Sequence, residues 1–344
     1  MNAEGGTLIE ATMIRHIGQT QIDRERWDNC VASSESERLY GYSWFLDHVA
    51  GSWDGLVVGE YEAVFPLPWR RSKYGLKIAR QPAFCQQLGL FSPQAGELSL
   101  ERVIQATPRS YILGQLDTHG QFAPEESAAG HRTNQVLSLA DDYPSIVTEK
   151  YVENHRRSLK KARKHGLRVE FTADLSPALR YSEALYAGKG LTPQPAHYAN
   201  LHRALTSPHN PFPRESVCCY ASTGELLGSL LVAHSWSRVF ILMGGCGDAG
   251  KKLCGNHLLY DAVIARYAGT GKLLDFEGSD LPAVNFFNKC FGAANETYHR
   301  VKFSPWPGLL AVASGIAEDG LLGFVKGWLA GRRPHPRCGP SFAP

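Results

Sequence analysis

The stretch that decides the fold runs from 239 to 303 and opens with the apolar segment Val239-Phe240-Ile241-Leu242-Met243. A glycine-rich segment follows, Gly244-Gly245-Cys246-Gly247-Asp248-Ala249-Gly250, and then a helical pattern over 257–268. A second apolar strand, Lys272-Leu273-Leu274-Asp275-Phe276-Glu277, leads into a short helix over 281–291 and a last strand over 298–303. This order predicts an α/β unit whose strand ends meet at a helix N-terminus, where such sheets bind ligands.

The composition indicates a globular chain with one locally basic segment. At 344 residues the chain is long enough for two domains, and 43% hydrophobic against 20% charged residues excludes a disordered protein. The net charge is +3, yet residues 155–168 contain seven of the 36 basic residues and no acid. The other 29 basic residues stand against 33 acids, so the positive charge is confined to that segment, which matters for its partners.

Several protein classes are disfavoured by the sequence. The first 18 residues have no long apolar core, and no run of about 18 apolar residues occurs, so neither a secretory signal nor a membrane span is expected. The eight cysteines show no metal-site spacing, which predicts reduced thiols, no bound metal and a cytoplasmic location. The apolar stretch over 307–330 is expected to form packed helices, with peripheral contact to a membrane surface as the alternative.

A boundary is predicted at Asp141-Asp142-Tyr143-Pro144, because proline is favoured at a helix start. One helix is expected over 145–165, ending at Gly166, since glycine favours a helix C-terminus. The predicted divisions are an N-terminal domain over 1–142, a C-terminal domain over 143–306, a helical segment over 307–330 and a disordered tail over 331–344. The second half then reads helix, strand, two helices, three antiparallel strands, and the unit that begins at 239.

This order of elements resembles the GNAT acyltransferase superfamily, and three motifs resemble its Fem-type members. One is the basic helix Arg156-Arg157-Ser158-Leu159-Lys160-Lys161-Ala162-Arg163-Lys164-His165-Gly166-Leu167 ahead of a strand. A second is Asp275-Phe276-Glu277-Gly278-Ser279 ahead of Phe286-Phe287-Asn288-Lys289-Cys290-Phe291-Gly292-Ala293, and the third is Tyr298-His299-Arg300-Val301. The resemblance covers roughly 20–305 and implies an α/β (α+β) fold of two GNAT-like domains, each a mixed, mostly antiparallel sheet flanked by helices.

The resemblance implies an enzyme, an N-acyltransferase that transfers an acyl or aminoacyl group to an amine acceptor. Fem-type members that use aminoacyl-tRNA and peptidoglycan precursors supply the first alternative, and a non-catalytic binding module is the second. No tightly bound cofactor is implied; the co-substrate is acyl-CoA or aminoacyl-tRNA, and the partners are an amine-bearing small molecule or cell-wall precursor and tRNA. Two positions depart from acetyl-CoA-using relatives: His257 replaces a small residue in the phosphate loop, and Phe287 replaces a tyrosine that acts as an acid.

Three residues are candidates for catalysis. Glu277, at a strand end, is placed to take a proton from the attacking amine, although it also suits the cap of the next helix. Asp275 lies two residues earlier and so shares its face of the strand, where it orients a basic partner or pairs with Glu277. Tyr298 is placed to supply an acid or to bind substrate, or it is a packing residue of its strand.

The donor site is predicted around the glycine-rich segment, where backbone N–H groups and lysines suit a phosphate or an acyl carbonyl. A plain hairpin or bulge is the structural alternative. The candidate donor-binding residues are Gly245, Gly247, Lys251, Lys252, Gly255 and Asn256.

The basic helix is predicted to bind a polyanion, because a merely solvated helix face usually mixes both signs of charge. That polyanion is tRNA, a nucleotide-linked precursor or an anionic membrane surface, and a simple solvated face is the alternative. The candidate polyanion-binding residues are Arg156, Arg157, Lys160, Lys161 and Lys164.

Overall fold

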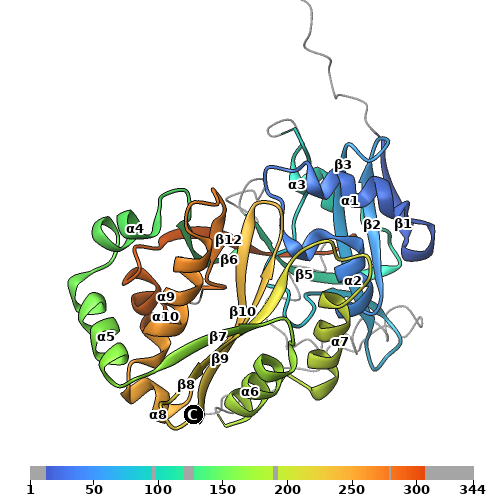
Figure 1. Ribbon diagram of the computed structural model, residues 1–344. Coiled ribbons are helices and arrows are strands. Elements are labelled where there is room, and N and C mark those ends of the chain that lie inside the picture. Colours follow the sequence, from blue (N-terminus) through green and yellow to red (C-terminus); the bar gives the residue numbers. More distant parts are fainter. Residues whose placement is uncertain (1–12, 95–97, 120–127, 189–192, 279, 307–344) are drawn as a thin grey trace, which may run out of the picture.

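The computed structural model describes residues 13–94, 98–119, 128–188, 193–278 and 280–306. These residues form a twelve-stranded sheet flanked by helices, in the strand order β1-β2-β3-β4-β5-β12-β6-β11-β10-β9-β8-β7 (Figure 1). The mixed α/β class predicted from the sequence is confirmed. The strands are β1 (Ile14–Gly18), β2 (Trp53–Val58), β3 (Ala63–Arg71), β4 (Lys77–Arg80), β5 (Tyr111–His119), β6 (Ala128–Ser138), β7 (Arg168–Thr172), β8 (Arg214–Tyr220), β9 (Leu226–His234), β10 (Arg238–Cys246), β11 (Leu273–Asp275) and β12 (Ala294–Phe303).

Short 3-10 turns and α-helices connect these strands. The turns are η1 (Gln19–Gln21) and η2 (Leu39–Gly41). The helices are α1 (Arg24–Ala32), α2 (Ser43–Val49), α3 (Leu100–Gln105), α4 (Tyr143–Glu149), α5 (Glu153–Lys164), α6 (Ser176–Ala187), α7 (Pro195–Leu205), α8 (Asp248–Lys252), α9 (Gly255–Tyr267) and α10 (Pro282–Lys289). Among the described residues, none of these helices is long and apolar enough to cross a bilayer.

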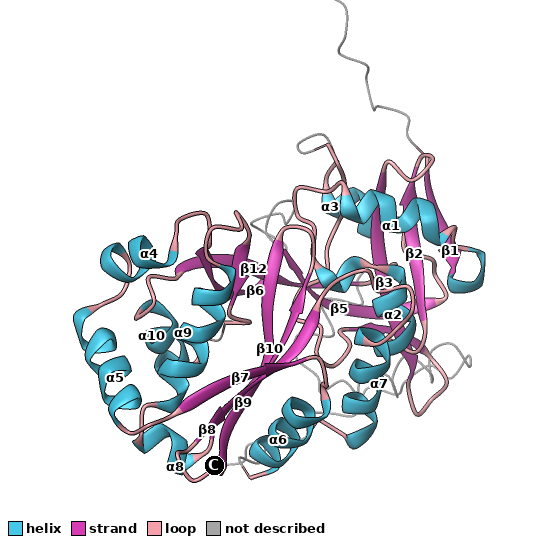
Figure 2. Cartoon of the chain, in the orientation of Figure 1, coloured by secondary structure: helices cyan, strands magenta, loops and turns pink. Residues whose placement is uncertain are grey.

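Both faces of the central strands are buried, which explains why 239–243 is apolar without alternation. On β10, Val239 and Ile241 enter one hydrophobic core, and Phe240 and Met243 enter the other. Helices α5 and α9 cover the first core, and α2, α6 and α7 cover the second. Figure 2 shows α4, α5, α9 and α10 on one side of strands β7 to β10, with α6 and α7 on the other.

The last strand joins the two halves of the chain into one sheet. β12 pairs antiparallel with β5 on one side and with β6 on the other, over Tyr298↔His119 and Ala294↔Val136 among other pairs. β6 precedes the proposed boundary at 142/143, yet it also pairs with β11. The sheet of the second half therefore includes a strand from before that boundary. The predicted segments 307–330 and 331–344 lie outside the described residues.

Two predicted elements differ from the structure. The single helix expected over 145–165 is two helices, because the chain turns at 150–152, where Val152 N donates to Cys290 O at 3.1 Å. The prediction of a glycine-rich turn over 244–250 is also wrong. β10 continues to Cys246, with Gly244 paired to Leu230 and Gly245 to Ser229, and α8 begins directly afterwards.

Candidate functional site

The site lies where the parallel strands β10 and β11 separate. The two strands pair only from Arg238↔Leu273 to Phe240↔Asp275, after which the β9 pairing of β10 is irregular between Ile241 and Met243. Beyond Asp275 the chain stays beside β6, with which β11 already pairs, since Phe276 N donates to Gln135 O at 3.0 Å. The carboxyl ends of parallel strands that part in this way are where open α/β sheets bind ligands.

Glu277 lies at the end of this separation with an unusual backbone. Its φ is 51°, a left-handed conformation that is rare for a residue with a long side chain and is typical of functional sites. Its carboxylate accepts a hydrogen bond from the hydroxyl of Tyr40, in η2 of the first half of the chain. Burial, followed by the charge of Asp275, raises the pKa of Glu277 well above its ordinary value. The Tyr40 hydrogen bond acts against that shift.

Asp275 holds the turn that contains Glu277. It is 1% exposed, and its Oδ1 accepts hydrogen bonds from Glu277 N and from Asn134 Nδ2, both at 3.0 Å. Its Oδ2 accepts from Arg238 Nη1 at 2.9 Å. Both oxygens are therefore engaged, so Asp275 orients a basic partner, Arg238, and fixes the backbone of Glu277.

Two buried arginines share the carboxylate of Glu296 beside this turn. Arg38 Nη2 lies 3.1 Å from Glu296 Oε2, and Arg238 Nη2 lies 2.6 Å from Glu296 Oε1. Although burial opposes the change, the two guanidinium groups lower the pKa of Glu296 to about 2. Burial also lowers the pKa of His119 well below its ordinary value, and Arg38 adds to the shift, so this imidazole is neutral.

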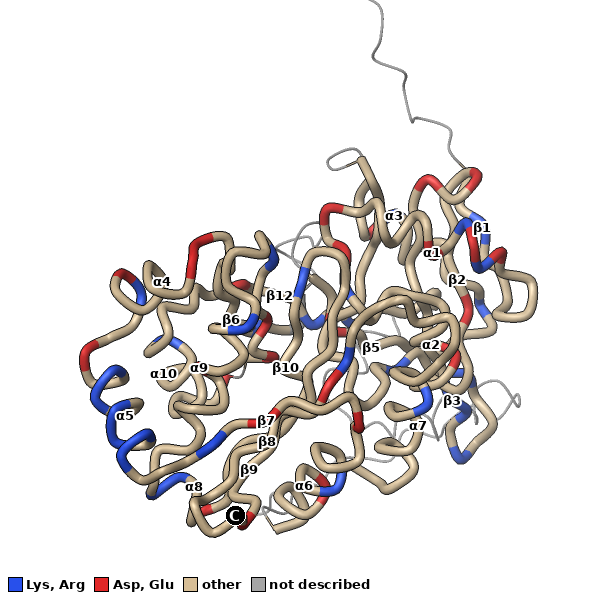
Figure 3. Tube along the Cα trace, viewed as in Figure 1, with Lys and Arg blue, Asp and Glu red and all other residues tan. Residues whose placement is uncertain are grey.

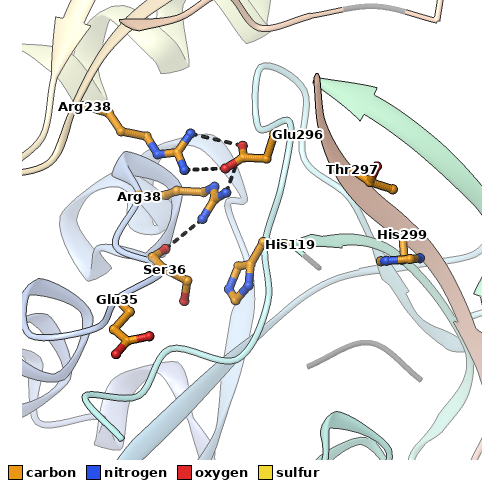
Figure 4. A pocket seen from close by; sticks show the side chains of 8 residues that line it. All are labelled: Glu35, Ser36, Arg38, His119, Arg238, Glu296, Thr297 and His299. Atoms are coloured by element: carbon orange, nitrogen blue, oxygen red, sulfur yellow. Dashed lines mark hydrogen bonds and ion pairs between the residues drawn. The ribbon is translucent and has the colours of Figure 1, made fainter. Parts of the chain in front are cut away.

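A pocket of about 420 Å³ opens over these arginines (Figure 4). Arg38 and His119 come from the first half of the chain, and Arg238 and Glu296 from the second. Its lining residues are Glu35, Ser36, Arg38, His119, Arg238, Glu296, Thr297 and His299. The pocket and Glu277 lie beside one another in the fold, because Tyr40 is two residues after Arg38 and Asp275 bonds both Arg238 and Glu277 N.

The candidate donor-binding residues surround the end of β10, where several backbone amides already have partners. Gly247 N donates to the hydroxyl of Tyr181 at 2.8 Å, and Cys246 N donates to Asn256 Oδ1 at 2.6 Å. Gly244 N donates to the hydroxyl of Tyr186 at 3.0 Å. An acyl carbonyl would have to replace one of these acceptors, so these three amides of the predicted donor site are not open in this structure.

The remaining donor candidates lie at the end of β10, on α8 and at the start of α9. Gly245 has a φ of 131°, and Gly255 begins α9 directly after Cys254, whose φ is 63°. Lys251 forms an ion pair with Asp248 at 3.2 Å, and Lys252 is exposed. These residues gather around one helix start, whereas Asn256 serves the backbone there.

The two positions that depart from acetyl-CoA-using relatives lie against each other. The rings of His257 and Phe287 have centroids 5.1 Å apart. His257 Nδ1 lies 2.6 Å from Nδ1 of His155 on α5, and the ring of Phe291 contacts His155. Burial lowers the pKa of both histidines, that of His155 to about 3. Both departures therefore belong to one aromatic cluster between α5, α9 and α10.

Helix α5 carries all five residues of the predicted polyanion site (Figure 3). Arg156 and Arg157 form ion pairs with Glu153 at 3.2 and 3.3 Å. Lys160, Lys161 and Lys164 are exposed and have no ion-pair partner among the described residues. The buried side of α5, which includes Leu159 and Ala162, packs toward α9.

Tyr298 and Asp280 lie near the site without joining it. Tyr298 is 8% exposed on β12, and burial raises its pKa, which disfavours proton donation at neutral pH. Asp280 lies just before α10 but does not cap it; its carboxylate binds Arg132 at 2.9 Å and accepts from Thr133 N at 2.9 Å. Leu281 occupies the N-cap position of α10 instead.

Sequence reasoning missed four residues of this site: Arg38, Tyr40, Arg238 and Glu296. One signal was available, because Arg238 is a charged residue directly before the apolar run of β10. The other three come from segments that show no motif.

Comparison with known proteins shows what the second half of the chain and the whole fold resemble. Residues 149–282 match the family described as acetyltransferase (GNAT) domain. This match agrees with the GNAT resemblance predicted from the sequence motifs. No curated protein is significantly similar to the chain in sequence.

Three solved structures have a similar fold. The structure of FemX has a TM-score of 0.61 at 12% identity, covering 91% of this chain and 100% of that one. A conserved protein of unknown function from Bacteroides thetaiotaomicron VPI-5482 has a TM-score of 0.53 at 9% identity, covering 85% and 99%. The C-terminal domain of a putative lysylphosphatidylglycerol synthetase from Agrobacterium fabrum has a TM-score of 0.50 at 13% identity, covering 89% and 95%. At these identities the likeness shows only that this chain and these proteins share a fold.

Proposed function

We propose that this chain, which carries a GNAT acyltransferase domain within a Fem-like fold, transfers an acyl or aminoacyl group to an amine acceptor, with Glu277 as the general base. The observation that carries the proposal is the placement of Glu277. Its carboxyl group lies where β10 and β11 separate, in a left-handed turn fixed by Asp275 and bonded by Tyr40. A base needs a pKa near the working pH, and burial moves that of Glu277 upward.

The reaction proceeds by direct transfer. The ammonium group of the acceptor gives a proton to the ionised carboxylate of Glu277, and the free amine nitrogen then bonds to the donor carbonyl carbon. The carbon–sulfur bond of a thioester, or the carbon–oxygen bond of an aminoacyl ester, breaks. The new amide nitrogen loses its second proton as the carbon–sulfur or carbon–oxygen bond breaks, and the leaving thiolate or alkoxide takes up that proton directly or through solvent. The proton held by Glu277 then passes to solvent, which restores the carboxylate.

The donor is acyl-CoA or aminoacyl-tRNA, and both carry phosphates. Lys251, Lys252 and the start of α9 provide cationic and amide contacts for phosphate. The lysines of α5 that lack an ion-pair partner among the described residues extend this positive surface away from the reacting centre. They favour the longer polyanion, tRNA, as the donor. In the related Fem-type reaction, the aminoacyl group carried by tRNA is transferred to a peptidoglycan precursor.

The variant Glu277→Gln tests the base. It keeps an acceptor for the Tyr40 hydroxyl but cannot take a proton at neutral pH. Transfer to an amine is expected to fall on the order of 10²–10⁴-fold. The rise of rate with pH that reports ionisation of Glu277 should vanish. Single-turnover transfer is measured from pH 5 to 9, with acyl-CoA and with aminoacyl-tRNA.

Glu225→Gln is the matched control, because Glu225 is an exposed carboxylate in the turn between β8 and β9. It should leave the rate unchanged. A Glu277→Gln enzyme with the wild-type rate at every pH would remove Glu277 as the base. A wild-type chain that binds donors but transfers to no amine would favour the binding module instead.

A further inference from the structure

The floor of the pocket holds more cationic donors than its carboxylates satisfy. Glu296 Oε2 is shared by Arg38 Nη2 and Arg238 Nη1, both at 3.1 Å, and by Asn134 Nδ2 at 3.2 Å. Arg238 also bonds Asp275, so it has two carboxylates. Within the described part of the chain, Arg38 has only its share of Glu296, which makes it the less compensated of the two guanidinium groups.

One donor of Arg38 has no partner among the described residues. Nη1 donates to Ser36 O at 3.0 Å and Nη2 bonds Glu296, but Nε has no hydrogen-bond acceptor. The residue is 4% exposed. Nε is itself covered, so its missing partner marks Arg38 as an incompletely paired guanidinium group, and a ligand would contact that group through the part that lines the pocket. Figure 4 shows Arg38 between Glu296 and Ser36, with His119 beside it.

The pocket suits a small ligand with one negative charge. Its volume of about 420 Å³ lies in the range of small-molecule sites. Arg38 offers a charge-assisted hydrogen bond, which is the strong kind. The carboxylate of Glu35, which is exposed and also lines the pocket, opposes a dianion such as a phosphate ester more than it opposes a carboxylate.

We propose that this pocket binds the carboxylate of the amine acceptor, which accepts a hydrogen bond from the guanidinium group of Arg38. The inference rests on the proposed function and names the acceptor class: a small amine that also carries a carboxylate, such as an amino acid or the end of a short peptide. The placement fits that role, since the pocket joins both halves of the chain beside Tyr40 and Glu277.

The proposal is tested by titrating the full chain with glycylglycine and with glycylglycinamide at millimolar concentrations and measuring each affinity by calorimetry. The two probes share an amine and a backbone and differ only in the carboxylate. Glycylglycine is expected to bind at least tenfold more tightly. Arg38→Gln should abolish this preference, and Glu35→Gln should strengthen glycylglycine binding two- to fivefold. Arg168→Gln, an exposed arginine on β7, is the control and should change nothing.

Equal binding of the two probes, or no binding of glycylglycine, would overturn the inference. Tighter binding of inorganic phosphate than of glycylglycine would also overturn it and would indicate a phosphate-bearing acceptor. If Arg38→Gln fails to fold, the Glu35→Gln variant still tests the inference, because Glu35 is exposed and its substitution should strengthen glycylglycine binding. Unchanged or weaker binding in that variant would overturn the inference.

Failure of the proposed transfer activity can be distinguished from failure of the pocket proposal. Glycylglycine that binds but is never acylated would leave the pocket in place and remove the function. Equal acylation of glycylglycine and glycylglycinamide would leave the function in place and remove the carboxylate role of Arg38.

Discussion

The hydroxyl of Tyr40 donates to the carboxylate of Glu277 and therefore stabilises its ionised form. Tyr40→Phe removes that hydrogen bond and keeps the ring, which packs against Phe240. The pKa of Glu277 should then rise further, so the midpoint of the pH–rate profile is expected to move to higher pH. Single-turnover rates from pH 5 to 9 measure the midpoint. Tyr220→Phe, on β8, is the control; a midpoint that is the same in all three proteins would contradict the role of Tyr40.

Residue types at strand ends could be predicted here, but their partners could not. Glu277 and Asp275 follow an apolar strand, which marks them as candidates from the local pattern. Tyr40 lies 237 positions earlier in the chain than Glu277, and no periodicity connects two such segments. The network of Arg38, Arg238 and Glu296 is likewise set by packing of distant elements, so it becomes visible only in the fold.

At the scale of elements, variants of α5 distinguish the two candidate donors, aminoacyl-tRNA and acyl-CoA. Lys160, Lys161 and Lys164 are exposed and unpaired among the described residues, so changing all three to Gln should leave the stability of the fold unchanged. Affinity for tRNA should fall, and the slope of log affinity against log salt should become less steep by roughly 2–3, since each phosphate contact contributes about 0.7–0.9. Affinity for acyl-CoA should stay the same. Filter binding between 50 and 200 mM salt measures the slope.

The control for α5 removes two exposed basic residues elsewhere, Arg102 on α3 and Lys302 on β12. It should leave tRNA binding unchanged. A triple variant of α5 with the wild-type affinity and salt slope would show that this helix is merely solvated.

Elements with a strong pattern were predicted, and those shaped by close contacts were not. The apolar run of β10 and the helix after the glycine segment both occur. The glycines of 244–245, however, do not form a turn. A side chain at Gly244 would place its Cβ 2.1 Å from Ser229 O, so glycine is required there by the neighbouring strand β9. A sequence cannot distinguish this cause from a turn, because glycine suits both.

At the scale of the whole molecule, the order of the strands in the sheet could not be predicted from the sequence. β12 lies between β5 and β6, so the last described strand completes a sheet begun in the first half of the chain. Such pairing depends on contacts between distant segments, which local patterns do not report. The consequence is functional, because this sheet brings Arg38, from one half, against Arg238 and Glu296, from the other.

Buried neutral histidines predict how the stability of the molecule depends on pH. His234 is 3% exposed, and burial, aided by the charges of Lys272 and Arg266, lowers its pKa to about 4 from 6.5. Between these values the unfolded chain binds a proton at this position and the folded protein does not. Stability from His234 is therefore full above pH 6.5 and is lost as pH falls toward 4. The raised pKa values of Glu277 and Asp28 act in the opposite direction, so the variant is compared with the wild type.

His234→Phe isolates this contribution, because phenylalanine keeps the ring contact with Tyr267 and cannot take up a proton. From pH 7.5 to 5 the wild type should lose about 2 kcal/mol through His234, at 1.36 kcal/mol per pH unit below 6.5. The fall in Tm over that range should be smaller in the variant by roughly 2–4 °C. The Tm of each protein at each pH is measured by thermal unfolding monitored by circular dichroism. His165→Phe, an exposed histidine after α5, should behave as the wild type does, and the same result for His234→Phe would show that His234 is not a source of acid sensitivity.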